Sequence, residues 1–269
     1  AREELRATAE ELASTPRTYV LLTIVSAVVA TAGLLLDSPA TVVGSMVIAP
    51  LIGPAMAAAV GTVVDDAELF KRGVAYQALG LGLVVVASTL FALVVQAINV
   101  VPPTLDPTQL GQVRERLAPD FLSLVVALGS GIAGAVSLTT GVSSALVGVM
   151  IAVALIPPAA TVGIGIAYGL PSVALTAGVL AAVNGLSINL AALVVFWQSG
   201  YHPERLFRRD EARAATVKRV AVLVVVILLL SAFLGGISYD SYENSRTSGE
   251  LRAEIGGLFA ADGPHPELT

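Results

Sequence analysis

The sequence contains no cysteine, so disulfide bonds and thiolate metal sites are excluded. Charged residues are also scarce: they make up 13% of the 269 residues, whereas soluble domains carry about one quarter. The chain has no P-loop, no H-E-x-x-H segment and no dinucleotide-binding fingerprint. We therefore expect a protein that is not an enzyme, holds no cofactor or metal ion, and has no nucleic-acid partner.

Long uncharged runs stand where the charges are missing. No Asp, Glu, Lys or Arg occurs between Arg72 and Asp106, or between Asp120 and Glu204, and the mean hydropathy is +0.83. A helix needs roughly 20 apolar residues to cross a bilayer, and these runs are far longer. The runs predict an all-α polytopic membrane protein with about seven transmembrane helices. We place them at residues 18–36, 40–63, 73–99, 121–140, 142–168, 172–197 and 217–238.

The basic residues predict an orientation. If the amino terminus is cytoplasmic, eleven Lys and Arg residues lie inside and four outside, as the positive-inside rule requires. We therefore expect a multi-pass protein of the cell membrane with a cytoplasmic amino terminus and an external carboxyl terminus. We also expect it to form a homo-oligomer in the lipid bilayer. Arg205, Arg208 and Arg209 either bind anionic lipid headgroups or only fix this topology.

An internal repeat appears when the sequence is compared with itself at an offset of 104 residues. Within 43–61, eight of nineteen positions are identical to their counterparts in 147–165. The first-copy members are Val43, Gly44, Met46, Leu51, Ile52, Pro54, Ala55 and Gly61. Each copy holds three predicted spans, and three is an odd number, so the second copy must enter the membrane from the opposite side. The chain is thus predicted to hold two inverted three-helix repeats, helices 1–3 and 4–6, plus a seventh helix.

Prolines lie in the middle of the second and fifth predicted spans. Proline donates no backbone hydrogen bond, so Pro50 and Pro54 should free the carbonyls of Met46 and Pro50. Pro157 and Pro158 should likewise free those of two residues in the fifth span, Val153 and Ala154. We expect both spans to be broken there. Paired broken helices in inverted repeats indicate a transporter-type site near the membrane midplane.

Neutral polar side chains lie on or near these segments and complete the candidate site. Asn184 and Ser187 are three residues apart and share one face of the sixth span. The candidate residues for binding a substrate or ion are Ser45, Met46, Pro50, Gly53, Pro54, Ser143, Val153, Ala154, Pro157, Pro158, Asn184 and Ser187. An alternative is that the small residues beside the prolines serve close helix packing alone.

The domain boundaries follow from the spans. Residues 1–16 form a cytoplasmic lead-in helix, either solvated or the end of a preceding soluble domain. The first repeat covers 17–100, an outer loop 101–120 and the second repeat 121–198. In that outer loop a short helix at about 107–117 is expected to cap the cavity. A basic cytoplasmic loop (199–216), the seventh helix (217–238) and an acidic external tail (239–269) complete the chain.

Three segments carry a resemblance to a known family. "VGSMVIAPLIGPAMAAAVG", "DDAELFKRG" and "LVGVMIAVALIPPAATVGIG" resemble the signature of the hydrophobic membrane family catalogued as domain of unknown function 389. The resemblance covers residues of about 15–200, and its core here is "MVIAPLIGP" (46–54). It implies the membrane topology and, in many members, a small soluble α/β domain before the membrane region. It implies no activity.

Two functions remain in view from the sequence. Hydroxyls, amides and freed carbonyls offer dipoles without charge, which favours channel-like or transporter-like passage of a small ion or polar solute at the repeat interface. The alternative is a non-transporting membrane sensor or scaffold that couples oligomerisation to a cytoplasmic domain. A wet vestibule lined by Ser45, Ser143 or Asn184 would favour passage, and a dry, packed axis would favour the scaffold.

Overall fold

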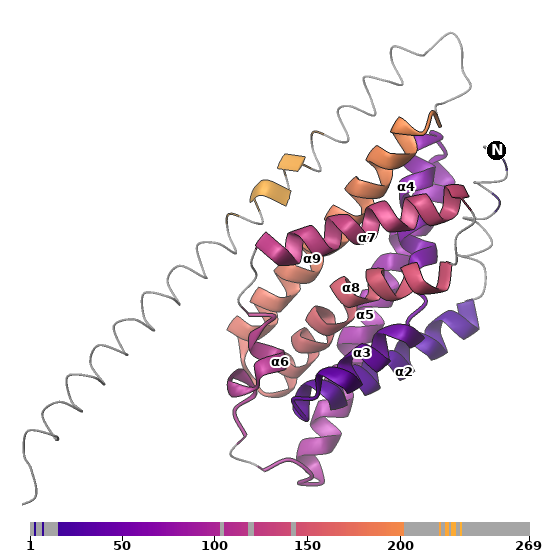
Figure 1. The fold of residues 1–269 in the computed structure, drawn as a ribbon. Helices are drawn as coiled ribbons and strands as arrows, with labels where there is room; N and C mark the ends of the chain where they lie inside the picture. The colour runs from indigo at the N-terminus through magenta and orange to yellow at the C-terminus, as the bar shows by residue number, and fades with distance from the viewer. Residues whose placement is uncertain are drawn as a thin grey trace, which may run out of the picture.

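The computed structural model describes residues 16–102, 105–117, 121–140 and 144–201, with isolated positions at 3, 7, 221, 224, 225, 227–229 and 232. Every regular element in this part of the chain is helical (Figure 1). Five of the described helices are long and apolar enough to cross a membrane, and one bent pair of helices passes the same test together, as a broken span or as a re-entrant loop. The protein is a polytopic helical membrane protein, as its composition predicts, and the part of the chain that the structure describes contains no strand.

The helices form two groups of similar order, joined by a loop. The first group holds α2 (Pro16–Leu35), α3 (Pro39–Ile48), α4 (Ile52–Val63) and α5 (Ala67–Ala97). The loop carries the 3-10 turn η1 (Pro107–Gln109) and the short helix α6 (Gly111–Arg114), two pieces where one short helix is predicted. The second group holds α7 (Phe121–Thr140), α8 (Ser144–Ala167) and α9 (Pro171–Gln198).

Some predicted features lie outside the described residues. These are the lead-in helix, the basic loop with Arg205, Arg208 and Arg209, the external tail, Ser143 and, apart from isolated positions, the seventh span. Among those positions Ile227 is buried and packs with Leu180 and Val183 of α9.

The second predicted span is broken, as its prolines indicate. α3 and α4 meet at an angle of 56° across residues 49–51. Ala49 is extended, with φ −72° and ψ 122°, because a residue that precedes proline is pushed out of the helical region. Pro54 lies in the first turn of α4, where backbone N–H groups have no intrahelical partner and a missing one costs little.

The predicted break in the fifth span is wrong. α8 is continuous from Ser144 to Ala167, with Pro157 and Pro158 inside it. The reason is that Pro50, the residue at the break, has Ala154 as its counterpart 104 positions later. Only Pro54 is repeated, as Pro158. The helix therefore loses backbone donors at two prolines but keeps its direction. Membrane helices tolerate such a loss when neighbouring groups donate to the freed carbonyls.

The turns after α4 and after α8 have the same structure. Asp65 and Gly169, which are 104 positions apart, both adopt positive φ angles of 58° and 66°. The backbone hydrogen bonds correspond as well: Asp66 N donates to Gly61 O at 2.8 Å, and Leu170 N donates to Gly165 O at 2.7 Å. The agreement extends the repeat from sequence identity to backbone geometry.

These two matching turns lie at opposite ends of α5. The first turn leads directly into α5 at Ala67, whereas the second lies beside its last residues, because Gln96 Nε2 donates to Ala167 O at 3.4 Å. A helix of 31 residues is about 46 Å long. Within each group α4 packs on α5 and α8 on α9, and between the groups α5 packs on α8 and α4 on α9.

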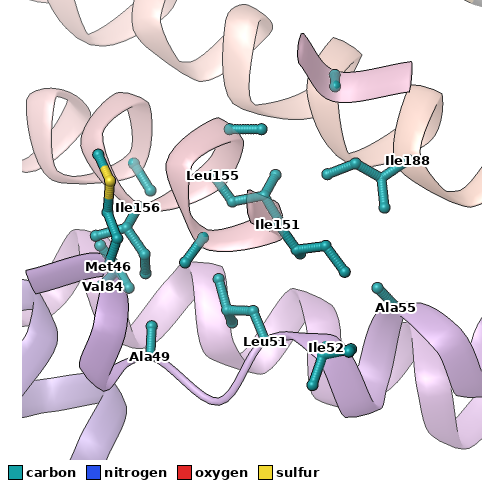
Figure 2. Close-up of a cluster of buried hydrophobic side chains, with 14 of the residues drawn as sticks. Met46, Ala49, Leu51, Ile52, Ala55, Val84, Ile151, Leu155, Ile156 and Ile188 are labelled. Carbon is teal, nitrogen blue, oxygen red and sulfur yellow. The ribbon is translucent and has the colours of Figure 1, made fainter. Parts of the chain in front are cut away.

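An apolar cluster fills the space between the bend and α8. Leu51 and Ile52 at the bend pack with Ile151 and Leu155 of α8, and Ile188 of α9 lies beside them (Figure 2). Ile151, Leu155 and Ile188 have no exposed surface. The contact between the two groups is therefore apolar and fully buried at this cluster.

We expect Gly61→Ala and Gly165→Ala to destabilise the protein by similar amounts. A Cβ at either position would lie within 2.7 Å of a backbone nitrogen, that of Phe70 or that of Ala174, so each turn must shift. Overpacking of this kind costs about 1–3 kcal/mol. The measurement is the free energy of unfolding in detergent micelles by SDS titration. Gly82→Ala is the control, because nothing lies within 4 Å of its Cβ position. Equal stability of all three variants would contradict the close contacts.

Candidate functional site

A cavity of about 600 Å³ lies between the outer loop and the second group of helices. α6 with the residues that follow it forms one side, the first turns of α7 form another, and the middle of α8 and of α9 forms the inner end. Val153, Ala154 and Pro158 of α8 line it together with Leu180 and Asn184 of α9. Asn184 lies at the midpoint of α9, so the cavity reaches halfway along that helix.

The inner end of the cavity is organised by a proline. Pro158 has no N–H to donate to the Ala154 carbonyl. Asn184 replaces that donor: its Nδ2 donates to Ala154 O at 2.8 Å. Only 4% of the Asn184 residue is exposed, and its Oδ1 is buried without a partner among the described residues. Asn184 thus stabilises α8 at the proline and keeps one acceptor unused.

A second carbonyl loses its donor one residue earlier. Pro157 cannot donate to Val153 O, and Val153 lines the cavity. In the following turn, the Thr161 hydroxyl donates to the carbonyl of Pro157 at 2.9 Å. The residues of α8 and α9 that line the inner end of the cavity carry no charged side chain.

The outer side of the cavity holds the charged residues. Arg114, Glu115 and Arg116 line it, and Arg116 pairs with Glu115 while also donating to the Gln112 carbonyl at 2.8 Å. The carboxylate of Asp37, in the turn after α2, accepts from Gln112 N at 2.7 Å. That bond fixes α6 against the first group of helices. Asp37 thus lies in the turn after α2, and its carboxylate caps the first turn of α6.

Hydrogen bonds also fix the start of the loop. The hydroxyl and then the backbone N–H of Thr108 donate to the exposed Asp106 carboxylate and lower its pKa. The carboxylate therefore stays ionised at neutral pH and caps η1.

The first group of helices holds its polar atoms differently. Ser26 of α2 donates to Ser45 O at 2.7 Å, and Ser130 of α7, its counterpart at an offset of 104, donates to Met150 O at 2.9 Å. Ser45 itself donates to Val42 O at 2.6 Å. These bonds satisfy carbonyls beside the bend and in α8 without any contact with the cavity.

The predicted site residues separate into two sets. The structure brings four of them together at the cavity: Val153, Ala154, Pro158 and Asn184. The others that are described lie away from the cavity lining, in the bend or in the packed interior: Ser45, Met46, Pro50, Gly53, Pro54, Pro157 and Ser187. Ser187 has no exposed surface and donates to Val183 O at 2.7 Å.

Sequence reasoning missed the walls of the cavity. Leu122 and Val126 of α7 and Leu180 of α9 are ordinary apolar residues in apolar helices, and no signal distinguishes them. A second amide contact, which is part-buried, joins α9 to α5 away from the cavity lining: Asn189 Nδ2 donates to Gln77 Oε1 at 2.9 Å.

Comparison with known proteins gives one family and one relative. The family described as Domain of unknown function (DUF389) matches residues 46–190. An uncharacterized protein of Methanocaldococcus jannaschii is 35% identical over 235 residues, which cover 87% of this chain and 69% of that protein. No solved structure matches.

We expect Asn184→Leu to cost less stability when position 158 can donate. In the wild-type background the substitution leaves Ala154 O without a donor, at a cost of roughly 1–3 kcal/mol. In the Pro158→Ala background the new N–H at position 158 restores the helical bond, so the cost of Asn184→Leu should fall by about 1 kcal/mol or more. SDS titration in micelles measures the four free energies of unfolding.

Asn189→Leu on the same helix is the control for this cycle. It should cost the same in both backgrounds, because its partner Gln77 does not involve the proline. If Asn184→Leu also costs the same in both backgrounds, the amide does not compensate for Pro158.

Proposed function

The chain belongs to the family described as Domain of unknown function (DUF389), and we propose that this integral membrane protein passes a small ion or polar solute through the cavity that ends at Asn184. The observation that carries the proposal is the cavity itself. It connects the charged outer loop with the midpoint of α9, where the Asn184 amide donates to the Ala154 carbonyl that Pro158 leaves without a helical donor. Sites of transporters lie at this depth and use interrupted hydrogen bonding of this kind.

The repeat supports the same proposal. We infer that the two groups of helices form inverted repeats, because their matching turns lie at opposite ends of α5. In transporters built on inverted repeats, one half moves against the other around a fixed site. The apolar cluster of Figure 2 closes the contact between the halves in this conformation. Passage therefore requires that Leu51, Ile151 and Leu155 separate.

The buried apolar cluster between the halves favours a second candidate. A membrane sensor or scaffold needs no path, and a cluster packed as tightly as that in Figure 2 would hold the two halves rigidly together. In that case the cavity would be a surface depression, and blocking it would change no flux.

Several further features belong to the proposal. We propose that the protein catalyses no reaction and lies in the cell membrane as a homo-oligomer. Its amino terminus would be cytoplasmic and its carboxyl terminus external. The loop that carries α6 would then face outward, and the cavity would open to the exterior. Anionic lipid would bind at Arg205, Arg208 and Arg209, which lie outside the described residues.

We expect Val126→Trp to reduce solute flux and Val125→Trp to leave it unchanged. Both residues are exposed neighbours on α7, but only Val126 lines the cavity, which an indole at that position would obstruct. Flux is measured in proteoliposomes with a panel of cations, anions and uncharged solutes. Passage through the cavity predicts at least a tenfold loss for Val126→Trp alone. Equal rates for both variants, or no flux by the wild type in any assay, would favour the scaffold.

A further inference from the structure

We infer that Tyr19 is the gate at the second end of the path: its side chain fills the counterpart of the cavity, on the side of the membrane opposite the outer loop. This inference rests on the proposed passage function, which needs an opening on each side of the membrane. It follows from the contacts of Tyr19 and from the correspondence of the two groups of helices at an offset of 104 residues.

The cavity lining has a counterpart in the first group of helices. The lining residues of α7, α8 and α9 each correspond to a residue 104 positions earlier, between 18 and 80. Three of these pairs matter here: Ser123 corresponds to Tyr19, Leu180 to Tyr76, and Asn184 to Gly80. The first-group members of the three pairs meet in the structure, and we call them the Tyr19 site.

Tyr19 contacts both other residues of this site. Its hydroxyl donates to the carbonyl of Tyr76 at 2.9 Å, and the two rings pack edge to face with centroids 5.9 Å apart. A Cβ atom on Gly80 would overlap the Tyr19 hydroxyl. The phenol therefore occupies the place where, in the second group, the Asn184 side chain begins.

The difference between a filled site and a cavity follows from the side chains. The second group has the small Ser123 where the first has Tyr19, and it is there that the cavity of about 600 Å³ lies. In the first group the phenol stands in that place and only 7% of Tyr19 is exposed. Shortening the side chain at position 19 should therefore open a space that resembles the cavity.

The Tyr19 site and the cavity lie toward opposite ends of α2. Tyr19 lies in the first turn of this helix, whereas α6, which forms one side of the cavity, is bound by Asp37 in the turn after the last residue. A helix of 20 residues is about 30 Å long, which is the thickness of the hydrocarbon core. A space at Tyr19 would thus open to the side opposite the outer loop, which is the cytoplasm in the orientation proposed above.

The two sites approach each other at the apolar cluster of Figure 2. Leu51 lies 3.4 Å from the Cβ position of Gly80, and Leu155 lies 3.7 Å from that of Gly185, the residue after Asn184. Leu51 and Leu155 are themselves counterparts at the offset of 104, and they belong to one buried cluster. The path is therefore closed at two points in this conformation, by the cluster and by Tyr19.

A membrane anchor is the other role that a tyrosine near a helix end can have. Anchoring tyrosines place their hydroxyl among the lipid headgroups. The Tyr19 hydroxyl instead points to α5, where it donates to the Tyr76 carbonyl and lies against Gly80. These contacts favour the gate.

The first test labels a buried thiol in the full chain. Leu51→Cys is the reporter, because Leu51 is buried beside the Tyr19 site and the chain has no native cysteine. A membrane-impermeant methanethiosulfonate is applied to intact cells and to inverted membrane vesicles. We expect Tyr19→Ser to speed the labelling at least tenfold in the vesicles alone. Tyr19→Phe, which keeps the ring, should change the rate less than twofold.

A second buried thiol controls for loosened packing. Leu34 lies on the same helix near its other end and has no exposed surface. Leu34→Cys should stay unlabelled with Tyr19→Ser. If Tyr19→Ser makes both thiols reactive, Tyr19 only packs the helices together, and the inference is wrong.

The second test measures flux per reconstituted protein in proteoliposomes, with the panel of cations, anions and uncharged solutes. Removing a gate raises flux, whereas a loss of packing alone lowers it or leaves it unchanged. We expect Tyr19→Ser to raise the flux of the solutes that the wild type passes at least threefold. Tyr19→Phe should remain within twofold of the wild type.

The outcomes separate the gate from the proposed function. Wild-type flux together with no labelling of Leu51→Cys in the Tyr19→Ser background, or labelling from the outer-loop side, would overturn the inference and leave passage intact. Wild-type flux that Tyr19→Ser does not raise would overturn the gate as well. No flux by the wild type or by Tyr19→Ser would overturn the proposed function, and the gate with it.

Discussion

Backbone hydrogen bonding in hydrocarbon is the constraint on which this structure depends. Each unsatisfied carbonyl inside a bilayer costs several kcal/mol, and prolines in two spans remove the donors that would satisfy them. The two halves of the protein compensate for the missing donors in different ways. At Pro50 the chain leaves the helix and bends by 56°, whereas at Pro158 the helix continues and an asparagine from the neighbouring helix supplies the donor.

That difference accounts for the position of the cavity beside α8 and α9. The bend of the first half is packed against α8 by Leu51 and Ile52, and serine hydroxyls donate to the Val42 and Ser45 carbonyls in the helix before it. In the second half the straight α8 stands beside Asn184, and the outer loop covers the space between α7, α8 and α9. The two groups of helices share one turn geometry, at Asp65 and Gly169, whereas the bent pair α3–α4 of the first group differs from the straight α8 of the second.

Much of the fold could be predicted from the sequence, because each helix that crosses a membrane needs a long run of apolar residues. The bend at Pro50, the repeat and the polytopic fold class follow from residues that can be counted. The predicted third span begins at residue 73, whereas α5 already begins at Ala67. The difference arises because Asp66 caps the helix and the charged Lys71 and Arg72 lie inside it. The predicted break in α8 is wrong because a proline in the sequence shows only that a backbone donor is missing. The side chain that replaces the donor, Asn184, lies 26 residues beyond Pro158.

The candidate site was predictable only in part for a related reason. The sequence indicates which groups need partners, such as Ala154 O, and which side chains can supply them, such as Asn184. It does not indicate which pairs meet, because that depends on how α8 and α9 cross. The apolar walls at Val126 and Leu180 carry no mark in the sequence that separates them from lipid-facing or core residues.

The account depends most on the two halves crossing the membrane in opposite senses, and the absence of native cysteine makes this directly measurable. Glu68 and Ser172 are exposed, occupy equivalent positions 104 residues apart, and are the second residues of α5 and α9. Single substitutions Glu68→Cys and Ser172→Cys, probed in intact cells with a membrane-impermeant maleimide, report the side of each. The account predicts labelling of Ser172→Cys from outside and of Glu68→Cys only after permeabilisation. Labelling of both from the same side would contradict it.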